Sequence, residues 1–337
     1  MEEAMKNVRL HVTKFVSGLL FGLALATGGS AAAAETVKFC FDWLPTSGDT
    51  PVLAAQKFGW FAEEGIELKI TPGGEYDQVL SVGLGEHDMT VGPGPSVLFG
   101  HQQDLPVISV GVTQPFSPAG LICRPDRGLD ADDPTTLAGV KVGIQPDSSY
   151  NTIWESYRDH YDLKGKVVEI PVGWDPIVMF TGQVDCFPDF LSLVPAMAAE
   201  EFGEPAVTYW TSAAQKTIGQ NLITNDTFAA EHPDLVRGFV RAYARGMQWA
   251  LRNTAEAVDL FLEVHPDFER SVMEIEAPAL QSFWVSSVQE AEGLLFQNDQ
   301  TWQPTHDILS TYGYIKKPID VSLVYTTEFL PNPPIMP

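Results

Sequence analysis

Aspartate and aromatic side chains follow apolar, strand-like segments at several places in this chain. The first of these segments covers residues 37–43 and carries Asp42 and Trp43 at its end. A carboxylate accepts hydrogen bonds from ring or amino N–H groups. An indole can stack on a heteroaromatic ring, and this stacking contributes about 0.5–1.5 kcal/mol beyond the free energy of burying the surface. Both residues also have a purely structural interpretation, because Asp42 could cap the loop and Trp43 could pack beneath it.

Further candidates lie where other predicted strands end or where a helix begins. The turn at 92–96 would present Ser96 and free backbone N–H groups. The serines at 148 and 149 open a predicted helix that should face the expected ligand-binding cleft. Helix entry, capping or a hinge would explain the same residues without a ligand. The candidate ligand-binding residues are Asp42, Trp43, Asp49, Pro95, Ser96, Gln114, Ser148, Ser149, Tyr150, Trp174, Asp175 and Asp189.

The candidate loops hold acidic residues but no Lys or Arg. The acids are Asp42, Asp49, Asp147, Asp175 and Asp189. Recognition of a sulfonate, nitrate or phosphate requires a cation or a free helix N-terminus. An acidic, aromatic cleft instead favours a neutral or cationic ligand rich in N–H donors, such as an aminopyrimidine, another nitrogen heterocycle, or an amine held by cation–π contact.

Alternating strand and helix patterns must position these loops. Strands are predicted at 37–43, 67–70, 89–91 and 107–112, with helices at 50–64, 76–84 and 96–102. The pattern restarts with strands at 121–123, 140–144, 167–172, 185–187 and 206–210 and helices at 150–160, 175–181 and 193–202. The last third is predicted to be mostly helical, at 234–251, 254–264 and 279–294. Such alternation predicts parallel sheets covered by helices, which bind ligands beyond the carboxyl ends of their strands.

The expected organisation is an α/β fold of two domains with the ligand between them. Residues 35–117 and 222–337 would form a discontinuous first domain and 118–221 the second, after a removable signal peptide at 1–34. Lys6, Arg9 and Lys14 precede an apolar run at 15–26, and four alanines end this segment. The run is shorter than the about 20 residues that span a bilayer, although a retained membrane anchor remains the alternative.

Charge and cysteine content exclude several classes of partner. The formal net charge of −24 argues against nucleic acid and against anionic membrane surfaces. Cys40, Cys123 and Cys186 lie in apolar contexts, which favours small buried thiols, although one pair could form a disulfide in an oxidising compartment. No cysteine pair has metal-ligand spacing and no H-E-x-x-H motif occurs, so neither a metal nor a cofactor is expected.

Several motifs occur in an order typical of one superfamily. They are Asp42-Trp43-x-Pro45, Gly59-Trp60-Phe61-x-x-x-Gly65-Ile66, Gly92-Pro93-Gly94-Pro95-Ser96-Val97-Leu98, Leu137-Ala138-Gly139-Val140-Lys141-Val142-Gly143, Gly182-Gln183-Val184-Asp185, residues 234–242 and Tyr325-Thr326-Thr327-Glu328-Phe329-Leu330-Pro331. Through them residues 36–331 resemble the periplasmic solute-binding proteins of ABC importers, in the branch that takes up thiamine pyrimidine precursors, alkanesulfonates, taurine, nitrate or riboflavin. The resemblance implies a two-domain, type II (Venus-flytrap) periplasmic-binding-protein fold with the ligand cleft between the domains.

The resemblance also implies a function. A monomeric periplasmic protein would deliver a small nitrogenous, heteroaromatic (pyrimidine-like) compound to an inner-membrane ABC permease with its ATPase, and the ligand would bridge both domains and favour the closed state. Members of the pyrimidine branch typically carry an asparagine and a histidine after Trp-x-Pro, whereas Asp49 stands about where that histidine would fall. The exact ligand therefore stays open, with an amine, another cation or a sulfonate as alternatives.

Two other functional classes remain possible from the sequence. Eukaryotic proteins of this fold are pyrimidine-synthesising enzymes with a cysteine-rich motif, and this chain has no such run. An enzyme acting on a pyrimidine-type heterocycle through its carboxylates is one alternative. A ligand-sensing subunit of a membrane receptor is the other.

Overall fold

The computed structural model describes residues 34–74, 76–145, 148–213 and 216–337. The expected signal peptide, except Ala34, and Asp147 lie outside the described residues, as does the side chain of Ser149. Within the described part of the chain, no helix has the length and apolar character needed to cross a membrane.

The first of two five-stranded sheets has the order β2-β1-β3-β10-β4. Its strands are β1 (Glu35–Cys40), β2 (Ile66–Thr71), β3 (Met89–Pro93), β4 (Val107–Val112) and β10 (Gln220–Asn225). β1 is parallel to β2 and β3, as expected, but β10 runs antiparallel to both of its neighbours. The prediction of a purely parallel sheet is wrong at this strand, which the sequence pattern did not indicate.

The second sheet has the order β7-β6-β8-β5-β9. Its strands are β5 (Ala119–Cys123), β6 (Lys141–Ile144), β7 (Val168–Pro171), β8 (Cys186–Phe190) and β9 (Val207–Tyr209). β6 is parallel to β7 and β8, whereas β5 is antiparallel to β8 and β9. The protein is therefore a mixed α/β structure with one central antiparallel strand in each sheet.

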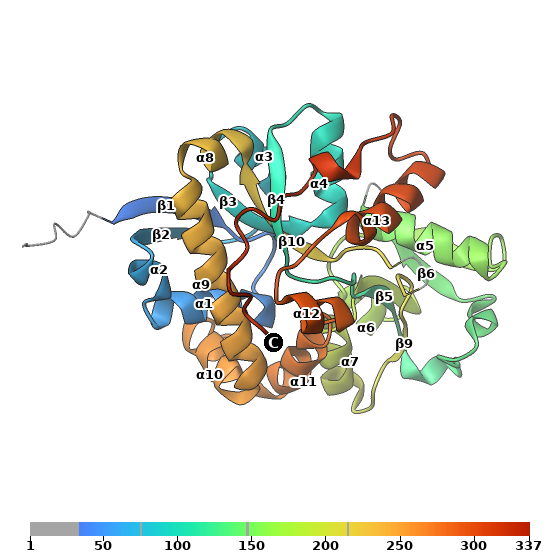
Figure 1. Cartoon of the computed structure of the whole chain (residues 1–337). Helices are drawn as coiled ribbons and strands as arrows, with labels where there is room; N and C mark the ends of the chain where they lie inside the picture. The colour runs from blue at the N-terminus through green and yellow to red at the C-terminus, as the bar shows by residue number, and fades with distance from the viewer. Residues whose placement is uncertain (1–33, 75, 146–147, 214–215) are drawn as a thin grey trace, which may run out of the picture. The chain divides into compact units, whose positions relative to one another are not determined.

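Helices cover both sheets (Figure 1). They are α1 (Thr50–Lys57), α2 (Trp60–Glu63), α3 (Gln78–Gly83), α4 (Gly94–Gln102), α5 (Ser149–His160), α6 (Ile177–Phe180), α7 (Leu193–Phe202), α8 (Asp226–Glu231), α9 (Pro233–Arg252), α10 (Thr254–Val264), α11 (Arg270–Gln281), α12 (Ser287–Glu292) and α13 (Asp299–Thr311). Short 3₁₀ turns η1 (Ser47–Asp49), η2 (Pro125–Arg127), η3 (Pro134–Leu137) and η4 (Val321–Leu323) complete the elements.

Two predicted helices are divided in the structure. The expected helix at 50–64 breaks at Gly59, whose φ of 75° lies in the left-handed region that glycine adopts without a steric penalty. The expected helix at 279–294 is instead the end of α11 followed by α12, and the Ser286 side chain caps the second of them. A helix at 299–311, which was not predicted, begins with a capping box at Asn298.

Two helices hold the first core together. α9 has a continuous apolar face that includes Phe239, Tyr243 and Met247, and these residues pack in one buried cluster with Phe39 of β1. α1 lies against α9 (Figure 1), and a Cβ at Gly246 would approach the Pro51 carbonyl oxygen to 2.0 Å. This close approach fixes α1, and with it the loop that joins β1 to α1.

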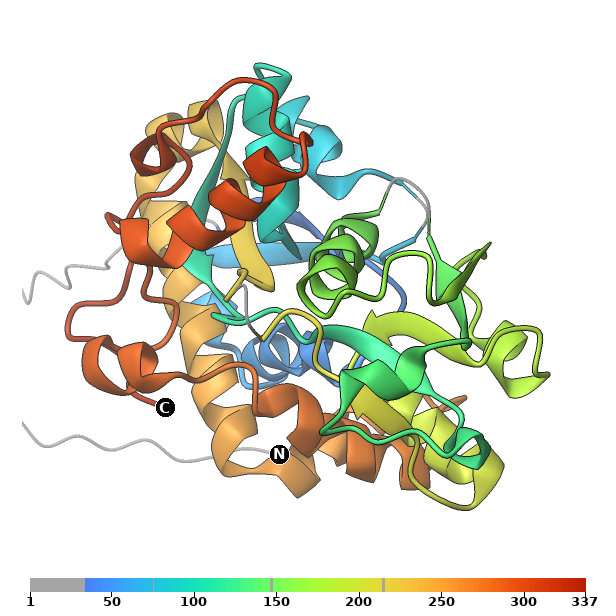
Figure 2. The same cartoon turned by 90° about the vertical axis from the view of Figure 1, so that its right-hand side faces the viewer.

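α11 connects the first sheet's loops to the second sheet's helices. It contacts both η1, which lies between β1 and α1, and α7, which follows β8. Figure 2 shows α11 (orange) beside α7 (yellow-green) at the bottom of the view. α11 is therefore placed to link the residues that follow β1 to those that follow β8.

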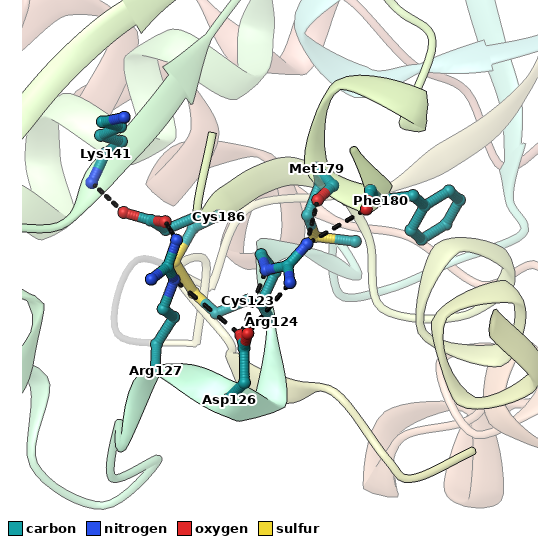
Figure 3. A network of polar contacts seen from close by, with 9 residues as sticks. Cys123, Arg124, Asp126, Arg127, Lys141, Met179, Phe180 and Cys186 are labelled. Carbon is teal, nitrogen blue, oxygen red and sulfur yellow. Dashed lines mark hydrogen bonds and ion pairs between the residues drawn. A yellow bond between two sulfur atoms is a disulfide. The ribbon is translucent and has the colours of Figure 1, made fainter. Parts of the chain in front are cut away.

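A disulfide joins Cys123 of β5 to Cys186 of β8 (Figure 3). The expectation of free thiols is wrong for these two residues, because the antiparallel register makes them direct neighbours with Cα atoms 4.0 Å apart. Cys40 is a buried free thiol, as expected. Beside the bridge, Arg124 donates hydrogen bonds to the Met179 and Phe180 carbonyls at the end of α6, each at 3.1 Å. This end of the second sheet is thus held by a covalent bond and by hydrogen bonds.

Candidate functional site

One edge of the first sheet carries the chain's first candidate, Asp42. This residue follows the carboxyl end of β1, and Gln114 follows the carboxyl end of β4. Because β10 is antiparallel, its first residue, Gln220, reaches the same edge and donates from Nε2 to Asp42 Oδ2 at 2.7 Å. The Gln114 and Gln220 side chains are only 5% and 7% exposed, yet the Oε1 atom of each has no hydrogen-bond partner among the described residues. Acceptors of this kind remain available to a ligand.

Asp42 is held in an environment that disfavours its charge. Burial raises the pKa of Asp42 to about 6, against the opposing effect of the Gln220 hydrogen bond. No Lys or Arg within the described ranges forms an ion pair with Asp42. A buried carboxyl with no cation beside it can exchange a proton or accept hydrogen bonds from a bound molecule.

Two more buried acids lie on the loop that follows Asp42. Asp49 ends η1 and is 6% exposed, and its pKa is raised well above the usual value by burial and by the charge of Asp42. Glu276 of α11 is fully buried and accepts a hydrogen bond from the Ser47 backbone N–H at 3.3 Å. Burial raises the pKa of Glu276 to about 7, and its Oε1 has no partner in the described structure. Glu276 therefore positions the loop that carries Asp49.

The second sheet contributes Asp189 and Tyr150. Asp189 lies near the carboxyl end of β8, where its Oδ1 accepts a hydrogen bond from the Phe190 N–H at 2.6 Å, and burial raises its pKa to about 7. Tyr150 lies in the first turn of α5, and burial together with the charges of Asp189 and Asp42 raises its pKa well above the usual value. Since both carboxylates act on the one phenol, Asp42 and Asp189 approach the same region from different sheets.

Aromatic rings form a continuous row from one sheet's loops to the other's. The ring centroids of Trp43 and Trp174 are 5.6 Å apart, those of Trp174 and Tyr150 are 6.1 Å apart, and those of Tyr150 and Phe190 are 5.5 Å apart. Trp43 and Trp174 remain 38% and 47% exposed. Flat rings beside buried carboxyls suit a flat ligand with N–H donors. We call the set Asp42, Trp43, Asp49, Gln114, Tyr150, Trp174, Asp189, Phe190 and Gln220 the strand-end site.

Four of the predicted residues lie in other surroundings. The Ser148 hydroxyl caps α5 by accepting from the Asn151 N–H, and it donates to the Gln145 carbonyl at 2.8 Å. Asp175 is exposed and accepts from the Ile177 N–H at the start of α6. Pro95 is buried in the first turn of α4, and Ser96 lines a hollow of about 160 Å³ between α3 and α4. Their contact with a ligand, like that of the strand-end site, stays a prediction.

Several residues of this region were not anticipated from the sequence. They are Gln220, Tyr243, Glu276 and Phe190. Tyr243 is buried in the middle of the apolar face of α9, and burial and the charges of Asp49 and Asp42 raise its pKa. A tyrosine at a core position of a helix gives no separate signal, and neither does a glutamate within an ordinary helical run. Gln220 could have been anticipated only if β10 had been recognised as a strand antiparallel to its neighbours.

Other features of the described structure are weaker candidates for a functional site. A hollow of about 380 Å³ lies at α10 and α11, but its Arg270 is already paired with Asp259 at 2.9 Å. Across the described residues, no group of three or more His, Cys, Asp or Glu side chains is arranged to hold a metal ion. The strand-end site is therefore the strongest candidate for ligand binding.

Comparison with known proteins is consistent across sequence and structure. A family model described as "NMT1/THI5 like" matches residues 47–257. The riboflavin-binding protein RibY of Chloroflexus aurantiacus is 26% identical, with 88% of this chain and 87% of that protein covered. The formylaminopyrimidine-binding protein of Halalkalibacterium halodurans is 25% identical, with 91% and 96% covered. A Legionella pneumophila protein named 4-amino-5-hydroxymethyl-2-methylpyrimidine phosphate synthase is 24% identical, with 88% and 93% covered.

Solved structures identify the fold. The alkanesulfonate-binding protein SsuA of Xanthomonas axonopodis superposes with a TM-score of 0.65 at 12% identity, covering 86% of this chain and 98% of that one. A Candida albicans protein described as having the generic periplasmic binding protein structural fold gives a TM-score of 0.61 at 15% identity, with 87% and 96% covered. The expected α/β periplasmic-binding-protein fold is thus confirmed.

Proposed function

Because this chain belongs to the NMT1/THI5-like family, we propose that it is a solute-binding protein that captures a small nitrogenous, heteroaromatic compound. The compound would lie in the strand-end site, between a first domain of residues 35–117 and 222–337 and a second of 118–221. An inner-membrane ABC permease with its ATPase would receive it from the monomeric binding protein.

The single observation that carries this proposal is the row of aromatic rings Trp43, Trp174 and Tyr150, which joins loops of both sheets. The charges of Asp42 and Asp189, which come from different sheets, both raise the pKa of Tyr150 in this row. A ligand in contact with both groups would favour a closed arrangement over an open one, because only the closed arrangement offers both sets of contacts. Two relatives are named for riboflavin and formylaminopyrimidine, which are both flat nitrogen heterocycles.

A periplasmic location is part of the proposal. The basic and apolar pattern of residues 1–34 is that of a secretion signal. The Cys123–Cys186 disulfide supports export, because such bonds persist in oxidising compartments and are rare in the cytosol.

Enzymatic turnover of a heterocycle is the second candidate, since one group of relatives is named as pyrimidine phosphate synthases. The buried carboxyls of the strand-end site could transfer protons. Against this, the described residues include no free cysteine besides the buried Cys40, so no thiol cluster is available for covalent or metal chemistry. Binding without turnover remains the function that the site supports best.

A ligand panel tests the proposal. Nitrogen heterocycles, amines and sulfonates are screened by thermal shift, and each hit is recovered and analysed by mass spectrometry. A ligand at 100 times its dissociation constant adds about 2.7 kcal/mol to the free energy of unfolding, which such a screen detects. We expect heterocycles to be bound and recovered unchanged. A panel in which only sulfonates bind, or in which the heterocycle is converted, would overturn the proposal.

A further inference from the structure

The charge balance of the strand-end region is unusual within this chain. Four carboxyl groups gather there, on Asp42, Asp49, Asp189 and Glu276, and in the described structure none of them forms an ion pair with a Lys, Arg or His. The charges of Asp42 and Glu276 act on Asp49, and those of Asp42 and Asp189 act on Tyr150. The four groups therefore share one region.

Other largely buried acids of the chain are neutralised by the protein itself. Asp185 is 8% exposed and pairs with Arg127, and the Glu64 side chain is 16% exposed and pairs with Arg241 at 2.7 Å. Burying a carboxylate with no counter-ion costs several kcal/mol, so this pairing is the usual arrangement. The strand-end region departs from it, because no cation among the described residues pairs with its carboxyls, and burial instead raises their pKa values and favours the neutral form.

Unpartnered hydrogen-bonding atoms in the strand-end region indicate which groups a ligand would bring. Gln220 is more than nine-tenths buried and already donates to Asp42, which leaves its unpartnered Oε1 beside that carboxyl. Gln114 and Glu276 also keep an unpartnered Oε1. These three oxygens suit an occupant that brings N–H donors, whereas the unpartnered hydroxyls of Ser47 and Thr113 can donate or accept.

We propose that the ligand is bound as a cation, namely a flat nitrogenous ring or amidine-like group whose positive charge is delocalised. Its N–H groups would face Asp42 and Asp189, and its plane would lie against Trp43 or Trp174. Aromatic faces attract a cation in addition to stacking on it, and the attraction grows when water is excluded. This inference rests on the proposed function and narrows its ligand class from neutral or cationic heterocycles to cationic ones.

A cationic ligand also explains how the two sheets could be drawn together. A positive ring between Asp42 and Asp189 is attracted to each carboxylate, and the full gain exists only when both carboxylates reach the ligand. A neutral ring would provide stacking and hydrogen bonds but not this attraction.

The test uses two probes of the same shape and different charge. N-methyl-4-aminopyridinium carries a fixed positive charge, and 4-methylaniline is its neutral counterpart at neutral pH. Calorimetry and thermal shift on the purified protein should show that the pyridinium binds at least about tenfold more tightly, which corresponds to about 1.4 kcal/mol. Equal affinity, tighter binding of the aniline, or no binding of the pyridinium at millimolar concentration would overturn the inference.

A charge-removing variant sharpens the test. Asp189→Asn keeps the size of the side chain and should reduce the preference for the pyridinium about tenfold or more. Glu292→Gln removes one exposed charge at the end of α12 and should leave the preference unchanged. A preference that survives Asp189→Asn would contradict the inference.

The wider ligand panel distinguishes failure of this inference from failure of the proposed function. If neutral heterocycles bind more tightly than cations, the proposed function stands and only this inference fails. A panel without any bound heterocycle rejects the function itself.

Discussion

Trp43 and Trp174 contact each other ring to ring, with centroids 5.6 Å apart and planes tilted by 55°. Trp43 follows β1 of the first sheet, and Trp174 follows β7 of the second. Both rings are partly exposed, so they lie where the strand-end site meets solvent. The pair therefore connects loops of the two sheets, at the position where we propose that a flat ligand binds.

Truncation of the Trp43 ring should weaken ligand binding without unfolding the protein. Trp43→Ala removes a stacking face and should raise the dissociation constant about tenfold, whereas Trp43→Phe should retain most of the affinity. Calorimetry with the best heterocycle of the panel measures both values, and circular dichroism checks the fold. An unchanged affinity for Trp43→Ala would remove Trp43 from the site.

Glu276 should make the unliganded protein less stable as the pH rises. Its pKa is about 7 in the folded protein against 4.5 for the free side chain, so the folded state binds the proton more tightly. The stabilisation is fully present below about pH 4.5 and is lost as the pH rises through about 7. Glu276→Gln removes this dependence, so above pH 7 the variant should be more stable than the wild type by about 3 kcal/mol, since each pKa unit is worth 1.36 kcal/mol.

Urea unfolding at several pH values provides the measurement for Glu276. Glu274→Gln is the matched control, because this residue is exposed on the same helix. Its stability curve should run parallel to that of the wild type. A Glu276→Gln curve that also runs parallel to the wild type would show that the buried carboxyl does not titrate as described.

The disulfide should contribute substantially to stability. Its cysteines lie 63 positions apart, and closing a loop of this length restricts the unfolded chain, so the double variant Cys123→Ser/Cys186→Ser should lose about 2–4 kcal/mol. Thermal unfolding with and without a reductant measures the effect, which should vanish in the double variant. Cys40→Ser serves as the control and should keep the response to reductant, because Cys40 is a free thiol. Reductant sensitivity in the double variant would contradict the pairing.

The contact between α1 and α9 gives a prediction about the scaffold. Gly246→Ala places a methyl group 2.0 Å from the Pro51 carbonyl oxygen and should destabilise the protein by about 3 kcal/mol. Gly238→Ala in the same helix meets the Glu64 Cβ at 2.9 Å, a less severe overlap, so its cost should be smaller. Chemical denaturation ranks the two variants, and the reverse order would contradict the described packing.

Much of the fold could be predicted because its signals are local. The spacing of apolar residues gave β4 and α7 with the bounds that the structure shows, and the Asp42-Trp43 segment was placed at a strand end. β10 escaped prediction because Gln220, Asn221, Thr224 and Asn225 leave only two apolar residues in its sequence. These polar side chains are buried, and their hydrogen-bond partners come from distant segments; Asn225, for example, donates to the Val82 carbonyl at 3.0 Å. Such partners are brought near by the tertiary structure, so the sequence of the strand itself shows no periodic pattern that would reveal them.

The same reasoning separates the predicted from the unpredicted part of the site. Asp42, Tyr150 and Asp189 could be predicted as candidates because each lies beside a recognisable strand or helix boundary. Glu276 was not, because its burial depends on the packing of α11 against η1 and α7. The cysteine pair was misjudged for a similar reason, since only the antiparallel register of β5 and β8 makes the two thiols neighbours.

The central claim is that one ligand contacts residues of both sheets at once. Calorimetric titration of Asp42→Asn and Asp189→Asn with the best heterocycle of the panel tests it most directly, because each variant alters one sheet only. We predict that each substitution alone raises the dissociation constant at least about tenfold, while both variants keep the wild-type circular dichroism spectrum. Full affinity in either folded variant would show that the ligand does not bridge the two sheets.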